Sequence, residues 1–267
     1  MKKIGRKALR VLVTMCLLLS LAVTSASAAA GSLIPRTGSP EQTTTTTKKS
    51  TTTTTTQASN GKVIYLTFDD GPGQYTEQLL DVLKKHNVKA TFFVTNQFPK
   101  YQKLIAREAE EGHAVAVHTY SHKYSQIYKS TDAYWSDFNK MNKIIKEQTG
   151  EKTTLFRFPG GSSNTVSKSY SKGIMTKLVK QANNKGYAYF DWNVDSKDAD
   201  GANTANKVCR NIKDGVKDRK NSIVLCHDVK SWTVEAMDKT ITWALKNGYT
   251  FKVLTNGGYT VHHSINN

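Results

Sequence analysis

The sequence predicts an α/β fold in which parallel strands form a single distorted (β/α) barrel. Over residues 62–267, short apolar runs rich in β-branched and aromatic residues alternate with amphipathic segments of helical period. Glycines follow several of these segments, as helix C-caps do: Gly112, Gly150, Gly186 and Gly248. A doubly wound open sheet is the alternative, but no G-x-G-x-x-G turn opens the first crossover. About 200 residues suit one compact domain.

Strands are predicted where apolar residues run together and a turn or a polar residue follows. In chain order they are 62–68, 90–94, 114–117, 155–157, 188–194, 223–225 and 250–254, of which 155–157 has the weakest pattern. Helices are predicted between them, where apolar residues recur three or four positions apart: 76–86, 101–111, 131–149, 169–185, 203–216 and 233–246. In a barrel of this kind, functional side chains are expected directly after the strands.

The N-terminal residues predict export. Basic residues precede an apolar run over 11–23, which ends before Ala26-Ser27-Ala28, so residues 1–28 read as a secretory signal peptide. That run is shorter than the roughly 20 apolar residues of a membrane span. Residues 29–61 are polar and rich in threonine, which predicts a disordered linker before the domain at 62–267. We therefore expect a secreted protein, extracellular or associated with the cell wall, without a transmembrane segment.

The net charge of the chain indicates what kind of partner it binds. The chain carries a net charge of +17, and removal of the leader's five cations leaves +12. In a secreted protein this positive charge favours binding to an anionic cell envelope, and no nucleic-acid-binding motif is present; a solvated lysine-rich surface is the alternative.

Cys16 lies in the leader, so Cys209 and Cys226 remain, either bridged or as two buried free thiols. We expect a monomer.

Asp69 and Asp70 follow the first predicted strand. Two neighbouring carboxylates repel each other and are costly to desolvate, so they indicate a bound cation, a proton-transfer role, or both. His118 and His122 follow a later strand, and a spacing of four would place both imidazoles on one side of a helical turn. With one carboxylate they would form a two-His, one-Asp set with open positions, which suits a catalytic metal.

Further polar residues follow other strands: Arg157, Asp195, Asp198 and His227. Each alone could be structural, since an aspartate after a strand often caps the next helix and an arginine could form a surface ion pair. Their joint position at strand ends instead predicts one shared site.

Five motifs resemble those of the NodB-homology polysaccharide deacetylases, carbohydrate esterase family 4. They are Thr67-Phe68-Asp69-Asp70-Gly71-Pro72, His118-x-x-x-His122, Arg157-Phe158-Pro159-Gly160-Gly161, Asp195-x-x-Asp198 and Leu225-Cys226-His227. The resemblance covers roughly residues 62–267, and its first, second and last motifs are specific in combination. It implies the barrel of NodB-homology type.

The resemblance also implies roles. Asp70, His118 and His122 would hold one divalent metal ion, usually zinc, while Asp69 would be the general base for the attacking water. His227 would be the general acid, oriented and kept cationic by Asp198, and Arg157 would pair with Asp69 and keep it ionised. Gly160 would donate its backbone N–H to the oxyanion, and Leu225 would line the acetyl pocket.

Two positions depart from the family pattern. Many members have Arg-x-Pro-Tyr in the third motif and tryptophan after the aspartate of the fourth, whereas this chain has Gly160 and Ala199. The aromatic walls of the acetyl and sugar sites are therefore altered. Trp232, which follows the last motif closely, is the best candidate for a replacement sugar platform.

The leading hypothesis is a secreted, metal-dependent polysaccharide N-deacetylase that acts on N-acetylated amino sugars, above all peptidoglycan N-acetylglucosamine. Deacetylation of chitin oligomers and ester cleavage in acetylated xylan are alternatives with the same chemistry. A different class is a cell-wall carbohydrate-binding protein that keeps the fold without turnover. A metal phosphoesterase is disfavoured, because the chain lacks a phosphate-binding loop and the carboxylates of a two-metal site.

Overall fold

The structure is a computed structural model that describes residues 59–267. The predicted signal peptide lies outside the described residues, and so does the predicted linker up to residue 58. Asn60, which we assigned to the linker, already contacts the domain: its backbone N–H donates to Gly248 O at 2.9 Å and its side chain to Asn247 O at 2.7 Å.

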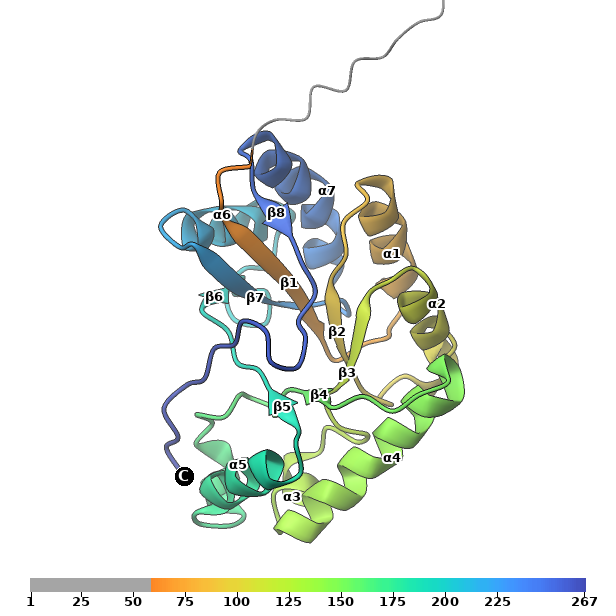
Figure 1. Cartoon of the computed structure of the whole chain (residues 1–267), viewed down its shortest axis with the longest axis vertical. Coiled ribbons are helices and arrows are strands. Elements are labelled where there is room, and N and C mark those ends of the chain that lie inside the picture. The colour runs from red at the N-terminus through yellow and green to blue at the C-terminus, as the bar shows by residue number, and fades with distance from the viewer. Residues whose placement is uncertain (1–58) are drawn as a thin grey trace, which may run out of the picture. The chain divides into compact units, whose positions relative to one another are not determined.

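Eight parallel strands form one curled sheet with helices on its outer side (Figure 1). The order across the sheet is β5-β4-β3-β2-β1-β7-β6, and β8 pairs with the first residues of β1. The strands are β1 (Val63–Asp69), β2 (Thr91–Val94), β3 (Ala114–Val117), β4 (Leu155–Phe156), β5 (Ala188–Tyr189), β6 (Val194–Asp195), β7 (Asn221–His227) and β8 (Thr250–Phe251). This arrangement confirms the predicted distorted barrel.

The helices lie between the strands in sequence, as predicted. They are α1 (Thr76–Lys85), α2 (Leu104–Glu110), α3 (Tyr124–Ile127), α4 (Thr131–Thr149), α5 (Ile174–Asn184), α6 (Ala205–Val216) and α7 (Ser231–Lys246), with 3₁₀ turns at Pro99–Tyr101 and Val166–Ser169. The helix predicted over 169–185 begins late because Gly173 adopts φ +74° and interrupts it. Within the described residues, no helix combines the length and apolar character needed to cross a bilayer.

The single strand predicted over 188–194 is wrong. β5 and β6 lie at the two ends of the sheet order and do not pair with each other, so the barrel is open between them. Residues 190–193 cross this opening, and the C-terminal segment runs alongside, with Asp191 N–H donating to Val261 O at 2.9 Å. Polar side chains within the crossing make their own bonds instead of a strand ladder: Asn193 Oδ1 accepts the N–H of Ile223 at 2.8 Å.

Strand alternation decides which side chains enter the barrel. In β1, Ile64, Leu66 and Phe68 pack against the outer helices, whereas Tyr65 belongs to the smaller inner core. Successive side chains point to opposite faces of a strand, so Asp69 faces inward like Tyr65. The same alternation applies to β7, whose His227 lies beside Asp69 in the parallel register.

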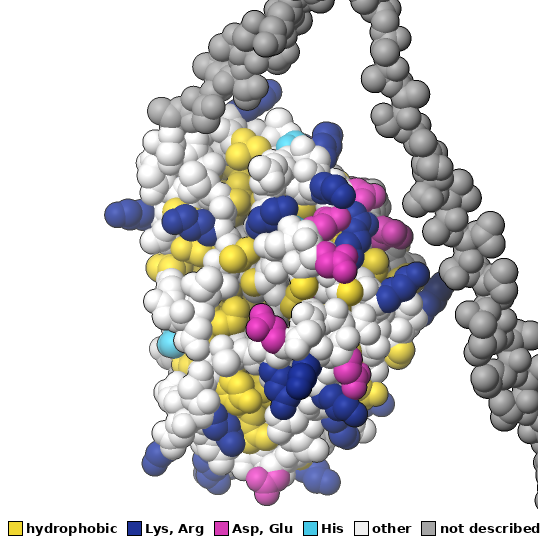
Figure 2. Space-filling model, turned by 45° about the vertical axis from the view of Figure 1, so that its right-hand side comes forward, with side chains coloured by type: hydrophobic (Ala, Val, Ile, Leu, Met, Phe, Trp, Pro, Cys, Tyr) yellow, Lys and Arg dark blue, Asp and Glu magenta, His cyan; other side chains and the backbone are white. Residues whose placement is uncertain are grey.

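The surface is basic without one dominant patch on the face that Figure 2 shows, where Lys and Arg side chains are spread out with Asp and Glu among them. Cys209 and Cys226 are both buried and free, so the structure contains two thiols here and no bridge between them.

Candidate active site

A tight turn after β1 gives the two neighbouring aspartates different surroundings: Asp69 contacts Arg157, and Asp70 faces the two histidines. Asp69 is buried, and Asp70 takes a positive φ of 76°, which turns the chain immediately after the strand. Thr95 holds this turn, with its N–H bound to Gly71 O at 2.7 Å and its Oγ1 to Asp70 O at 2.8 Å. A Cβ at position 71 would overlap the carboxylate of Asp228, so only glycine fits there.

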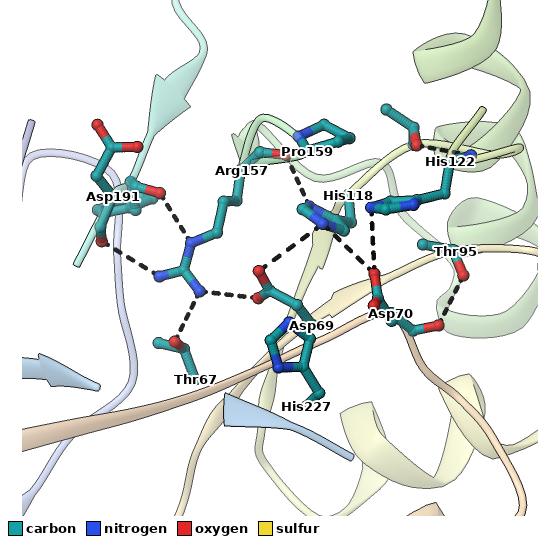
Figure 3. Close-up of polar contacts among 12 residues, drawn as sticks. Thr67, Asp69, Asp70, Thr95, His118, His122, Arg157, Pro159, Asp191 and His227 are labelled. Atoms are coloured by element: carbon teal, nitrogen blue, oxygen red, sulfur yellow. Dashed lines mark hydrogen bonds and ion pairs between the residues drawn. The ribbon is translucent and has the colours of Figure 1, made fainter. Parts of the chain in front are cut away.

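The two histidines converge from a loop. Our prediction of a helical turn over 118–122 is wrong, because Thr119 and His122 adopt φ of 144° and 52° and no helix forms there. The Asp137 carboxylate on α4 accepts the N–H groups of Tyr120 and Ser121 at 2.7 and 3.2 Å, which holds the loop in this shape. Both imidazoles nevertheless face Asp70, as Figure 3 shows.

The donor set of Asp70, His118 and His122 fits a divalent cation. Asp70 Oδ1 lies 3.6 Å from His118 Nε2 and 3.3 Å from His122 Nε2, and one ligand atom from each residue lies within 4.8 Å of the others. Among the described residues, Asp70 Oδ1 is buried without a hydrogen-bond partner. His118 Nδ1 donates to Arg157 O at 2.9 Å, which leaves its Nε2 lone pair free to bind a metal.

Arg157 is buried and holds the carboxylate of Asp69. Its Nη1 donates to Asp69 Oδ1 and to Thr67 Oγ1, each at 2.8 Å, and its Nε donates to Phe190 O at 2.9 Å. With a fully buried side chain, it is not the surface ion pair that was the alternative prediction. Burial raises the pKa of Asp69 to about 6, although Arg157 and His227 oppose this increase. The Asp69 carboxyl can thus exchange a proton near neutral pH.

His227, which is partly buried, and the buried Asp198 form a second pair. His227 Nδ1 donates to Asp198 Oδ1 at 2.7 Å, and Asp198 Oδ2 accepts the His227 N–H at 2.7 Å and Thr233 Oγ1 at 2.6 Å. Burial alone would lower the pKa of His227, but the hydrogen bond to Asp198 and its charge outweigh burial and raise the pKa to about 9. The imidazole is therefore a cation at neutral pH, with Nε2 as its remaining proton donor.

The three residues predicted to contact the substrate, Gly160, Leu225 and Trp232, differ in how far they are buried. Gly160 is exposed, with φ +76°, and a side chain there would meet the hydroxyl of Tyr124. Leu225 is buried and pairs with Thr67 across the strands, two positions before His227. Trp232 is half-buried; its Nε1 donates to Asp198 O at 3.0 Å, and Lys230 Nζ lies 5.7 Å from the centre of its ring.

Asp195 does not join the site through its carboxylate, which binds the N–H of Lys197 at 2.8 Å and its ammonium at 3.1 Å. Sequence reasoning missed Asp191, whose Oδ1 accepts the Ser162 N–H at 2.8 Å and whose main-chain oxygen accepts Arg157 Nη2 at 3.2 Å. It also missed Tyr128, whose hydroxyl donates to Pro159 O at 2.8 Å. Asp191 lies inside the single strand predicted over 188–194, and no motif spacing marks Tyr128, so the sequence pattern identified neither residue.

Together these residues form a hydrolytic arrangement. A carboxyl group with a pKa near neutrality, a cationic imidazole and a three-ligand metal set meet at the carboxyl ends of β1, β3 and β7. Such a set can remove a proton from water at one point and return one to a leaving group at another.

Comparison with known proteins identifies the family. Residues 56–179 match the family model described as polysaccharide deacetylase. A peptidoglycan-N-acetylglucosamine deacetylase of Bacillus cereus is 32% identical over 199 residues, which cover 72% of this chain and 68% of that protein. A peptidoglycan-N-acetylmuramic acid deacetylase of Bacillus subtilis is 34% identical over 194 residues, 72% of this chain and 69% of that protein.

A solved structure agrees with these relatives. The catalytic domain of the peptidoglycan N-acetylglucosamine deacetylase from Eubacterium rectale superposes with a TM-score of 0.76 at 54% sequence identity. The match covers 77% of this chain and 94% of that one. The chain therefore belongs to the polysaccharide deacetylase family, carbohydrate esterase family 4.

Proposed function

We propose that this protein is a secreted, metal-dependent N-deacetylase that removes acetyl groups from N-acetylglucosamine units of peptidoglycan. The observation that carries the proposal is the juxtaposition of the Asp70, His118 and His122 donor set with the buried Asp69 base. Named relatives act on peptidoglycan amino sugars, which supports the same substrate class here. The predicted leader and the basic composition support a substrate in the cell envelope.

Asp70, His118 and His122 would hold the divalent ion, which we propose to be zinc because two imidazoles and one carboxylate suit it. When bound, the ion would supply Lewis-acid activation of water and of the acetyl carbonyl. Asp69 would take a proton from the attacking water, while Arg157, 2.8 Å away, keeps the carboxylate in place. The N–H of Gly160 would donate to the developing oxyanion.

The second half of the reaction needs a proton at nitrogen. His227, held as a cation by Asp198, would give its Nε2 proton to the departing amine as the bond between carbon and nitrogen breaks. Water adds its oxygen to the acetyl carbon, so the products are acetate and a sugar with a free amine. Leu225 would contact the acetyl methyl, and Trp232 is the proposed contact for the sugar ring.

The test is acetate release from peptidoglycan, chitin oligomers and acetylated xylan, each measured with a chelator and after addition of zinc. We expect release from peptidoglycan that the chelator abolishes and zinc restores. Faster release from chitin oligomers or xylan would replace the proposed substrate with one of those polymers. Absence of metal-dependent release from all three would overturn the enzymatic proposal in favour of carbohydrate binding without turnover.

Two matched variants test the division of roles between the adjacent aspartates. Asp69→Asn should retain zinc and lose turnover, because it removes the base and leaves the three ligands intact. Asp70→Asn should lose both, since it removes the only carboxylate among those ligands. Zinc affinity is measured by calorimetric titration of the metal-free proteins. Equal loss of zinc affinity in the two variants would contradict the assignment.

A further inference from the structure

The proposed oxyanion donor is the backbone N–H of Gly160, a residue with no side chain of its own to anchor the peptide. Gly160 and Gly161 adopt φ of 76° and 78°, a region that glycine enters freely. Within residues 59–267, no acceptor is bound to the Gly160 N–H, and the residue is exposed, so this donor is available to a ligand. Because glycine has no Cβ, rotation of the peptide between Pro159 and Gly160 is limited by the turn hydrogen bond from Gly161 N–H to Phe158 O, 2.8 Å long, and by bonds to the peptide itself.

Tyr128 makes a hydrogen bond to the carbonyl of this peptide. Its buried hydroxyl donates to Pro159 O at 2.8 Å. The peptide between Pro159 and Gly160 is trans, and in a planar trans peptide the C=O and the N–H point in opposite directions. Holding the Pro159 oxygen against the buried hydroxyl therefore holds the Gly160 N–H on the other side, away from the interior.

The Tyr128 ring is itself fixed on two sides. It stacks on Tyr134 with ring centres 6.0 Å apart and meets Tyr124 edge to face at 5.4 Å. Tyr124 in turn packs edge to face on His122 at 5.6 Å, so these rings lead from a proposed metal ligand to the glycine loop. On the loop side, Asn164 Nδ2 donates to Gly161 O at 2.9 Å and approaches the Tyr128 hydroxyl at 3.5 Å.

We propose that Tyr128 is a positioning residue for the oxyanion donor. It holds the peptide between Pro159 and Gly160 in the orientation that presents the N–H, and its hydrogen bond to the carbonyl polarises that same peptide. The inference rests on the proposed function, because it takes the Gly160 N–H as the donor in N-deacetylation. It goes further in assigning a catalytic contribution to a buried side chain that touches no reacting atom.

Tyr128→Phe removes the hydroxyl and keeps the ring. Loss of one neutral hydrogen bond predicts a decrease in kcat of about tenfold, with KM and zinc affinity unchanged. Tyr134→Phe is the matched control: the neighbouring stacked hydroxyl is buried and makes no hydrogen bond within the described residues, so its kcat should equal that of the wild type. Equal kcat values in the two variants would overturn the proposal.

NMR of the Gly160 amide tests the proposal without measuring turnover. The sequence contains two Pro-Gly pairs, Pro72-Gly73 and Pro159-Gly160, so carbonyl-¹³C proline with ¹⁵N glycine gives two correlated amide signals by NMR. The Gly73 amide, which donates to Thr76 Oγ1 at 2.7 Å, serves as the reference. Tyr128→Phe should shift or broaden the Gly160 signal and leave the Gly73 signal in place, while Tyr134→Phe should change neither.

An unchanged Gly160 signal in Tyr128→Phe would refute the positioning role whatever the kinetics show. Conversely, absence of acetate release from the wild type would refute the proposed function, and the NMR comparison would still decide whether Tyr128 sets the peptide orientation. The two failures are thus distinguishable. Thermal unfolding of both variants checks that each change in signal arises in a folded protein.

Discussion

Replacement of Asp198 by asparagine should lower the pKa of the His227 imidazole by more than two units. In the wild type the pKa is about 9 because the bond to Asp198, 2.7 Å long, and its charge outweigh the opposing effect of burial. Asparagine removes the charge, so burial becomes the dominant influence and the pKa should fall to the ordinary 6.5 or below. At pH 7.5 the protonated fraction would then be about a tenth or less.

The same change has a defined effect on stability. Because the folded-state pKa of His227 lies above the ordinary value, its protonation stabilises the fold fully below pH 6.5, and this contribution is lost as the pH rises through about 9. The difference between 6.5 and 9 corresponds to roughly 3 kcal/mol in the free energy of unfolding. Asp198→Asn should lose this pH dependence.

The direct assay is an NMR titration of the imidazole C–H signals in metal-free protein, with the His227 signal identified by its absence in His227→Gln. Thr233→Val is the control, since it deletes the 2.6 Å bond to Asp198 Oδ2 and leaves the carboxylate charge in place. Its His227 should titrate close to the wild-type value. A His227 signal that still titrates near pH 9 in Asp198→Asn would refute the role of the carboxylate.

Two further changes test stability. Arg157→Met should lower the free energy of unfolding in urea by about 3 kcal/mol or more, because it leaves the buried Asp69 charge without its partner. Lys197→Met breaks an exposed ion pair with Asp195 and should lower the free energy of unfolding by less than about 1 kcal/mol. Equal losses of stability in Arg157→Met and Lys197→Met would contradict a special cost for the buried pair. Gly150→Ala should lower the free energy of unfolding by about 1 kcal/mol, because alanine is strained at the φ of 91° although no atom obstructs a Cβ there. An unchanged midpoint of thermal unfolding would contradict this reason.

The strand ends that carry Asp69 and His227 were predictable from the sequence because they depend on local pattern. An apolar run predicts the strand, and the carboxyl end of a parallel strand is where a barrel of this kind carries its functional side chains. The alternation of side chains along the strand then predicts that Asp69 points into the barrel. His227 follows from the same reasoning applied to β7, which pairs with β1 in register. These inferences need only the sequence near each residue and the rule that parallel strands share one functional face.

The histidine loop was not predictable in the same way. A spacing of four residues is compatible with a helical turn, but the positive φ values of Thr119 and His122 are imposed by contacts with distant residues such as Asp137. Asp191 and Tyr128 are further examples, because their partners at Ser162 and Pro159 lie 29 and 31 residues away in sequence. Only the folded chain brings such partners together.

Three carboxylates of the site differ in the groups that face them. Asp69 pairs with Arg157, and Asp198 pairs with His227, so each of these carboxylates has a cationic partner. Asp70 instead faces His118, whose pKa is held well below its ordinary value by burial and which is therefore neutral at pH 7. Among the residues that the structure describes, Asp70 Oδ1 has no hydrogen-bond donor either. A buried carboxylate oxygen without a hydrogen-bond donor is costly, and a divalent ion held with the two histidines would remove that cost.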